Sequence, residues 1–450
     1  MNDNQNPGGP GGINPDDFEA LLRHFLNREG PLDPEQLAEA AGLAKDPAAM
    51  AAMLEQIKRA MSSLQAQGST NGSASGGVNW ELATTQAKAI AHSGSVAISD
   101  SVRKSIQDAI SIGSLWLNES TAIPELVGEP KLLSRELWVA DAMPLFQALS
   151  EPVANRMSEA LSENLTANAP EEIQEILGNA SGVMKSAGGA LFAMQLGQAL
   201  GKLSQEVLTG GDIGLPLFKD QRAAFIAQNL EAFVKGLEIE RDQAYIYLVI
   251  REMAHVRLFK HSKWLRDAVV SQIAKYASEI SIDNSRISEI AEDFDPENPD
   301  ELRVALESGA FIADRTDAQS AALASIETLL ALIEGWVDVV TEEATRRMPR
   351  AAAVAEAVRR RRATGGPAEL TFGALVGLEL RPRRLREAAA MWREVGAAVG
   401  IDKRDALWDH PDLVPSGVDI ENPAALISKL REGGQLPDAF DQALRDLLSE

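Results

Sequence analysis

The chain has 450 residues, a formal net charge of -23 and no cysteine. This charge argues against a general binder of nucleic acids or anionic membranes, and the lack of cysteine excludes disulfides and thiolate metal sites. Any transition metal would have to be held by carboxylates and by the five histidines. The N-terminus has no signal-peptide pattern and the sequence has no run of about 20 apolar residues, so we expect a cytoplasmic protein without a membrane span.

The two ends of the chain differ in composition from its middle. Residues 1–15 are rich in Asn, Gly and Pro, which predicts a disordered tail. Residues 16–64 have short segments of helical pattern and are interpreted as a small helical appendage, and residues 65–77 as a Gly/Ser linker. We therefore expect a main helical domain over residues 78–425, followed by an acidic tail over residues 426–450.

Nearly the whole main domain shows helical periodicity, which predicts a mainly α fold. Thr209–Leu217 is predicted to be a loop, with a small strand element as the alternative. The many glycines of residues 171–208 are interpreted as points where helices cross closely, because glycine is costly inside a helix without such a reason.

The stretch from Tyr245 to Leu265 is predicted to be the central helix. Most of it is apolar, yet Arg251, Glu252 and His255 lie in its middle. Positions three and four apart share a helix face, and buried charges need partners. The pattern therefore predicts a polar site in a core helix. It reads R-E-x-x-H, which differs by one residue from H-E-x-x-H, the helix motif of zinc proteases.

A second long helix with charge inside an apolar run is predicted over Ala318–Met348. It carries Glu334 and Asp338, which are four residues apart and hence on one face. A catalytic zinc site needs three protein ligands with one open position, and a carboxylate that takes the proton of the bound water. Glu334 is the candidate for the ligand that the central helix does not supply.

An arginine-rich segment, residues 359–386, stands out in the otherwise acidic chain. One interpretation is an anion or nucleic-acid patch, and the other is a basic segment that packs on the acidic main body. Since the segment lacks an aromatic ladder and the chain is strongly negative, we expect packing and no binding of nucleic acid. Surface ion pairs are individually weak, so most of the docking energy should come from Phe372, Leu375, Leu378 and Trp392.

Four stretches of the sequence resemble the family of zincin-like metallopeptidases, type 2, whose members are described as hydrolases. These are LVIREMAHVRLFKHSKWLR, EGWVDVV, RRRRATGGPAELTFGALVGLELRPRRLREAAAMW and RDALWDHPDLVP. The resemblance covers residues 113–423 and implies a zincin-like helical core. It implies Glu252 as general base, His255 and Glu334 as metal ligands, and Asp338 beside the ligands.

Arg251 departs from the active motif of that family, which has its first histidine at this position. Arginine cannot ligate a metal, but a guanidinium between Glu252 and Glu334 would satisfy both carboxylates and replace the charge of a zinc ion. We therefore expect no cofactor, with zinc held by His255 and Glu334 as the alternative. A buried polar network without activity or ligand is a third interpretation.

The remaining histidines are not predicted to be metal ligands. His261 follows His255 by six residues, as in a longer zinc motif, but that motif requires glycine where this chain has Leu258. His261 is therefore interpreted as a surface or helix-end residue. His24, His92 and His410 have no ligand spacing and are interpreted as structural or exposed.

One leading hypothesis and two alternatives follow for the function. The leading hypothesis is a zincin-fold protein with a degenerate zinc site, which acts as a binding or regulatory module for a protein or peptide ligand. The first alternative is a hydrolase, either zinc-dependent with an altered ligand set or metal-free with Glu252 as base. The second is a structural protein that binds partners. The sequence leaves open whether the chain is an enzyme.

Overall fold

The computed structural model describes residues 78–126, 128–167, 189–190, 192–215, 217–279, 283, 285–286, 313–364, 373 and 383–432. Within these residues the chain is mainly α-helical, and the predicted fold class is confirmed. The tail, appendage and linker predicted for residues 1–77 lie outside the described residues, as do residues 433–450 of the predicted acidic tail. None of the described helices is long and apolar enough to cross a membrane.

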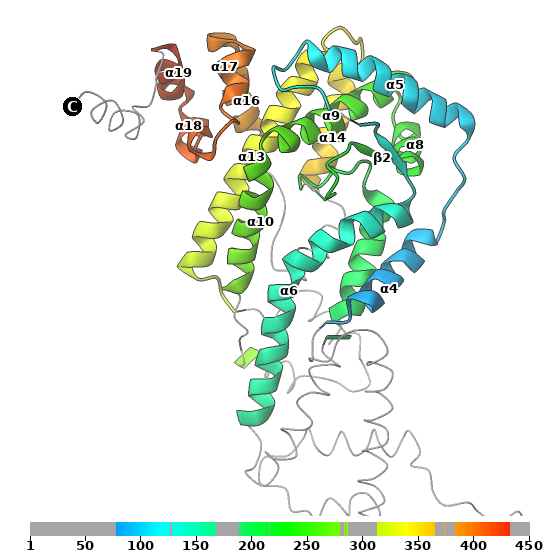
Figure 1. Cartoon of the computed structure of the whole chain (residues 1–450), viewed down its shortest axis with the longest axis vertical. Coiled ribbons are helices and arrows are strands. Elements are labelled where there is room, and N and C mark those ends of the chain that lie inside the picture. Colours follow the sequence, from blue (N-terminus) through cyan, green and yellow to red (C-terminus); the bar gives the residue numbers. More distant parts are fainter. Residues whose placement is uncertain are drawn as a thin grey trace, which may run out of the picture.

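The helices are distributed along the whole described chain (Figure 1). They are α4 (Trp80–His92), α5 (Asp100–Asn118), α6 (Arg135–Ala167), α8 (Ala227–Lys235), α9 (Arg241–His261), α10 (Lys263–Ser278), α13 (Asp317–Thr345), α14 (Ala351–Thr364), α16 (Leu385–Val399), α17 (Ile401–Ala406), α18 (Gly417–Glu421) and α19 (Pro423–Arg431), with a 3-10 turn, η1, at Pro411–Leu413. Residues 192–206 are helical as well.

The strands lie at a different place from the one expected. Strand β1 (Lys131–Leu133) pairs in parallel with β2 (Ala224–Ile226), and these two form the sheet of the described residues. Thr209 contributes one isolated antiparallel bridge to Phe225, at the edge of β2. The segment that follows Thr209 instead turns back over α9, where its backbone groups meet polar side chains.

Helix α9 is the centre of the fold. Every residue from Ala244 to Phe259 is buried except Arg251, so the helix is covered on all sides rather than along one stripe. Its neighbours are α5, α8, α13 and α14. Figure 1 shows α9 crossing α13 beneath α5, with α14 close by.

Helix α13 is the second core helix. It begins with a capping box, in which the Thr316 hydroxyl accepts from the Gln319 backbone and the Gln319 side chain accepts from the Thr316 backbone. It packs along α10 and α16, and Figure 1 shows α10 and α13 side by side. Because its residues from Leu330 to Thr341 are buried, any charged side chain in this run needs a partner inside the protein.

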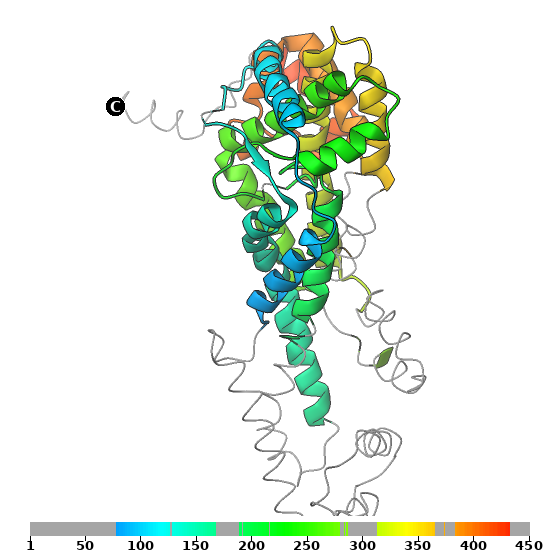
Figure 2. The same ribbon diagram turned by 90° about the vertical axis from the view of Figure 1, so that its right-hand side faces the viewer.

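Helix α6 extends away from the helices that surround α9 (Figure 2). Pro144 and Pro152 lie inside it. Each proline removes a backbone donor and crowds the preceding turn, yet the helix continues through both.

The helix of residues 192–206 crosses α4 at two glycines. A Cβ atom at Gly197 would lie 2.8 Å from the Ala83 carbonyl oxygen, and one at Gly201 would lie 2.6 Å from Ile90 Cβ. These two glycines therefore mark a close helix crossing, as the sequence predicted for this region.

Candidate functional site

Helices α9 and α13 bring the predicted site residues together. Arg251, Glu252 and His255 lie on α9 within little more than one turn, and Glu334 lies on the facing part of α13. Glu252, His255 and Glu334 are buried. A polar centre this deep in a helical core is expensive unless each group is compensated.

Glu334 is compensated by two arginines. Nη2 of Arg251 donates to Glu334 Oε2, and Nη2 of Arg362, on α14, donates to Oε1 at 3.4 Å. Burial alone would raise the pKa of Glu334, but the charges of Arg251 and Arg362 outweigh it and hold this pKa at about 2. The same carboxylate raises the pKa of Arg251, so the pair is ionised at every physiological pH.

Glu252 is held by the backbone instead of by an arginine. Its Oε2 accepts from the Gly211 N–H at 3.0 Å and its Oε1 from the Ala224 N–H at 3.2 Å, and the Thr209 hydroxyl donates to it as well. The expectation that Arg251 lies between both carboxylates is thus wrong for Glu252. The loop after Thr209 and strand β2 supply donors that a single-sequence motif does not reveal.

Burial makes Glu252 a carboxyl group that changes its charge near neutral pH. Burial raises its pKa to about 7, although the hydrogen bonds from Thr209, Gly211 and Ala224 oppose this shift. A carboxyl group with a pKa near the working pH can both accept and release a proton. Chemically, Glu252 is therefore able to serve as a general base or acid.

His255 is neutral and partly unsatisfied. Its pKa is lowered to about 4, mainly by burial; the charges of Arg251 and Arg362 act in the same direction, and that of Glu334 opposes them. Its Nε2 is buried without a hydrogen-bond partner among the described residues. Its ring lies 4.9 Å from that of Phe259, measured between centroids.

A short loop, residues 208–214, covers this centre. A Cβ atom at Gly211 would lie 2.4 Å from His255 Nδ1, so only glycine allows the loop to approach the ring this closely. Gly214 has a φ of +79°, and a Cβ atom there would lie 3.0 Å from Glu334 Oε1. The loop is fixed at Asp212, which accepts from the Leu208 N–H at 2.9 Å and pairs with Arg361 at 2.8 Å.

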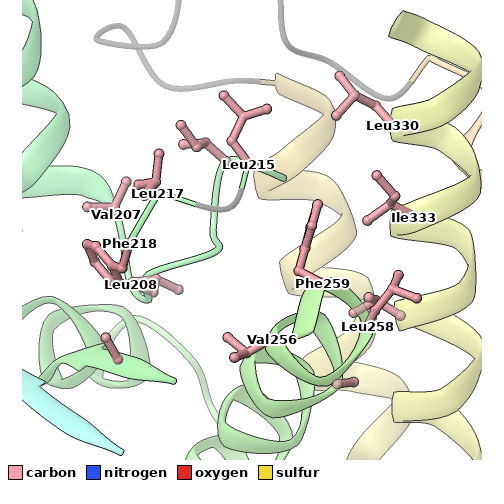
Figure 3. Close-up of a cluster of buried hydrophobic side chains, with 14 of the residues drawn as sticks. Val207, Leu208, Leu215, Leu217, Phe218, Val256, Leu258, Phe259, Leu330 and Ile333 are labelled. Carbon is pink, nitrogen blue, oxygen red and sulfur yellow. The ribbon is translucent and has the colours of Figure 1, made fainter. Parts of the chain in front are cut away.

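Apolar side chains surround the polar centre on several sides. Figure 3 shows them facing one another from the segment after residue 206, from α9 and from α13. Those labelled are Val207, Leu208, Leu215, Leu217, Phe218, Val256, Leu258, Phe259, Leu330 and Ile333. They exclude water, which strengthens the ion pairs inside and raises the cost of any group without a partner.

Little free space remains in this centre. A cavity of about 10 Å³ is bounded by Thr209, Gly211, Arg251, Glu252 and His255, among others. A second, of about 20 Å³, is bounded by Glu252, His255, Phe218 and Phe259, among others. Such volumes hold about one water molecule each.

Asp338 lies one turn beyond Glu334 and has its own partner. Arg359 donates to it from Nε at 3.2 Å and from Nη2 at 3.0 Å. The sequence placed Asp338 beside the ligands, and the structure places it on the same side of α13 but in a separate ion pair.

The remaining histidines lie elsewhere. His261 is the last residue of α9, is exposed and contacts Asp409 Oδ1 through Nε2 at 2.7 Å. His410 precedes η1 and accepts from the Asp412 N–H at 3.2 Å. His92, at the end of α4, pairs with Glu136. His24 lies outside the described residues.

Three parts of the centre were not among the predicted site residues: Arg362, the loop of residues 208–214, and the pair of Asp212 with Arg361. The run of four arginines at 359–362 could have given a signal. On a helix, Arg359 and Arg362 share a face, and on α13 they pair with Asp338 and Glu334, respectively.

The fold and this centre define a helical protein with a buried charged site on its two core helices. The model of the zincin-like metallopeptidase family matches residues 78–427, and the chain belongs to this family. Among solved structures the chain is similar to one entitled "Crystal structure of a putative hydrolase with a novel fold from Chloroflexus aurantiacus", at 19% sequence identity and a TM-score of 0.54. That match covers 79% of this chain and 100% of the other, and it shows the fold alone. No curated protein matches the chain.

The family implies a zinc ion, and the side chains of this centre do not fit one. A catalytic zinc needs three protein ligands, whereas Arg251 offers none and Glu334 already receives a guanidinium on each oxygen. His255 Nε2 is able to ligate a metal, and it is buried without a hydrogen-bond partner among the described residues. In the described parts of the chain, no three His, Asp or Glu side chains are grouped so that they could hold a metal ion.

Proposed function

We propose that this chain is a zincin-fold protein in which arginine charge replaces the metal, and that it acts as a binding or regulatory module. The observation that carries the proposal is the pairing of Glu334 with both Arg251 and Arg362. A metal ligand must offer a lone pair toward the metal, and both oxygens of Glu334 are directed at guanidinium groups. The positive charge that a metal ion would supply next to Glu334 is therefore supplied by Arg251 and Arg362.

The size of the centre supports the same proposal. A peptidase must bring a peptide bond next to the general base and the Lewis acid. Here the two spaces next to Glu252 measure about 10 Å³ and 20 Å³, and the loop of residues 208–214 lies against His255. A peptide would have to displace this loop, so we propose that ligands bind outside the polar centre. The ligand class is a protein or peptide.

Zinc binding is the direct test. We would titrate zinc by calorimetry into wild type, Arg251→His, and Arg251→His combined with Arg362→Met. Wild type should not bind zinc. Arg251→His completes H-E-x-x-H and should bind measurably, and the double variant should bind more tightly because Arg362 no longer competes for Glu334.

The control is the addition of His255→Ala to the double variant, which should abolish zinc binding by removing one of the three ligands. Tight binding by wild type that disappears with His255→Ala would overturn the proposal. Absence of binding in all variants would show that Glu334 is not positioned as a ligand.

A second candidate function is metal-free hydrolysis, and one observation favours it. Glu252 has a pKa of about 7 and lies near a neutral His255, so two groups of different protonation state stand in one centre, as in many acid–base sites. Hydrolysis of peptide and ester substrates in the presence of a chelator, measured for wild type and Glu252→Gln, tests this candidate. Turnover by wild type that falls by about 100-fold in Glu252→Gln would establish it.

A further inference from the structure

A third cavity lies where α9 ends, next to the segment that follows α5. It measures about 280 Å³ and is bounded by Pro124, Glu125, Leu126, Arg257, Lys260 and His261. Arg257 follows His255 by two residues, and two residues turn an α-helix by about 200°. The cavity is therefore on the opposite side of α9 from the polar centre.

Arg257 is the unusual residue in this cavity. Its side chain is only 1% exposed, and its Nε and Nη2 have no hydrogen-bond partner within the part of the chain that the structure describes. Burial lowers the pKa of Arg257, and the charge of Glu125 opposes this shift. Buried guanidinium groups are normally paired with an acceptor on the donors they present, so the arrangement is incomplete without an acceptor.

The two unpaired donors form one edge of the guanidinium, and this chain uses that same edge for carboxylates elsewhere. Arg359 donates from Nε to Asp338 Oδ1 at 3.3 Å and from Nη2 to Oδ2 at 3.0 Å. Arg404 holds Asp405 in the same way, at 2.8 and 3.3 Å. The spacing of the two donors matches the two oxygens of a carboxylate.

The helix dipole explains why basic residues lie at the end of α9, but it does not explain why Arg257 is buried. Basic side chains are favourable at the C-terminus of a helix because they complement its dipole. This explains Lys260 and His261, which lie in the last turn, and His261 is in addition bound to Asp409. Such residues remain at the surface, whereas Arg257 is enclosed.

The other walls suit a small organic acid. Pro124 and Leu126 offer apolar surface, and Lys260 adds a second positive charge. Glu125 is exposed and accepts from Asn118 Nδ2 at 3.5 Å, so it stands at the rim as a competing carboxylate rather than as the partner of the guanidinium. A volume of 280 Å³ is close to the lower end of the range for ligand pockets.

We propose that this cavity is a binding site for a small carboxylic acid with a short apolar body, and that Arg257 receives the carboxylate. Since the unpaired edge is shielded from solvent, binding includes a turn of the guanidinium toward the cavity. The site is separate from Glu252, His255 and Glu334, and the proposal does not depend on the replacement of zinc.

Benzoate is a suitable probe, with benzamide as a neutral molecule of the same shape. Calorimetric titration in a low-salt buffer free of carboxylates should show benzoate binding to the full-length wild type and no binding of benzamide. Arg257→Lys keeps the charge but loses the paired donors, so benzoate should bind about tenfold more weakly. Arg257→Met should not bind it, and Arg360→Met, at an exposed arginine of α14, should bind like wild type.

Glu125→Gln keeps the test valid if the Arg257 variants fail to fold, because Glu125 is exposed and its substitution should leave the fold unchanged. Removing this competing charge should tighten benzoate binding. The proposal is overturned if wild type binds no benzoate at millimolar concentration, or if benzamide or inorganic phosphate binds to wild type as well as benzoate does. It is also overturned if Arg257→Met binds benzoate as wild type does, or if Glu125→Gln binds benzoate no more tightly than wild type.

Discussion

Glu334 has no exposed surface, and each of its two oxygens faces a different arginine. An ionised carboxylate is stable at such a position only when its partners compensate for the lost hydration. Arg251 and Arg362 divide this task, since one comes from α9 and the other from α14. The two ion pairs of Glu334 therefore also connect helices α9, α13 and α14.

Removal of Arg251 should be costly. In Arg251→Ala the buried Glu334 keeps only Arg362, at 3.4 Å, and we expect the free energy of unfolding to fall by about 3 kcal/mol. Urea unfolding at pH 7.5 measures it. The matched control is Arg360→Ala on α14, whose side chain is 75% exposed, and which should change stability by less than about 0.5 kcal/mol. Equal stability of the two variants would contradict the role assigned to Arg251.

Glu252 and His255 should give opposite contributions to the pH dependence of stability. The pKa of Glu252 rises from 4.5 to about 7 on folding, so its contribution is present below pH 4.5 and is lost as the pH rises to 7. The pKa of His255 falls from 6.5 to about 4, so its contribution is present above pH 6.5 and is lost as the pH falls to 4. Each effect amounts to about 3 kcal/mol.

Between pH 4.5 and 6.5 these two contributions should largely cancel in the wild type. Substitution then separates them. In Glu252→Gln, stability relative to wild type should increase with pH over this interval, and in His255→Gln it should decrease. Urea unfolding at four pH values gives both slopes, and Glu334 does not interfere because its contribution changes below pH 4.5. The same slope in both variants would show that the two groups are not buried as described.

At the scale of elements, the core helices approach one another closely at glycines. A Cβ atom at Gly335 of α13 would lie 2.8 Å from the Ala389 backbone nitrogen and 2.9 Å from the Ala388 carbonyl carbon, both on α16. Backbone atoms of a neighbouring helix cannot move aside as a flexible side chain can. Gly335 directly follows Glu334 in the sequence, so the close approach of α13 to α16 also affects the distance between Glu334 and α9.

Gly335→Ala should therefore destabilise the protein although alanine is the better helix former. Overpacking of this kind costs about 1 to 3 kcal/mol beyond the gain of about 1 kcal/mol from helix propensity. Gly396→Ala in α16 is the matched comparison, because its Cβ would lie 3.4 Å from Arg404 Cδ, an ordinary contact. We expect it to be neutral or stabilising. Thermal melts of the two variants decide the point, and a stable Gly335→Ala would show that α13 and α16 can separate.

At the scale of the whole molecule, the sequence predicts the two core helices better than it predicts what lies between them. Arg251, Glu252 and His255 could be placed on one face because helical spacing is a local property, and Glu334 stands out as a charge in an apolar run. The N–H groups that donate to Glu252 belong to a loop and to a strand of three residues. Neither the loop nor this short strand has a periodic pattern that can be recognised in the sequence. Arg362 reaches Glu334 only because α14 folds back onto α13 and α9, and such contacts are set by tertiary packing.

The arginine-rich segment illustrates how charge is used across the molecule. Within α14, Arg359 pairs with Asp338, Arg361 with Asp212 and Arg362 with Glu334, so three neighbouring charges are directed inward. Trp392, on α16, is buried and donates to the Leu332 carbonyl at 2.9 Å, as expected for an apolar anchor. Phe372, Leu375 and Leu378 lie outside the described residues.

This inward direction of charge leads us to predict that the chain does not bind nucleic acid. Binding to a phosphate backbone requires several exposed cations that release counterions, while the net charge here is -23 and the inward-facing arginines of α14 already hold carboxylates. Fluorescence anisotropy with labelled DNA and RNA at 50 mM salt should show no saturable binding to the full-length protein. Tight, salt-sensitive binding that is lost in Arg359→Ala combined with Arg360→Ala would refute this prediction, since it would mean that α14 leaves the acidic body to present its arginines.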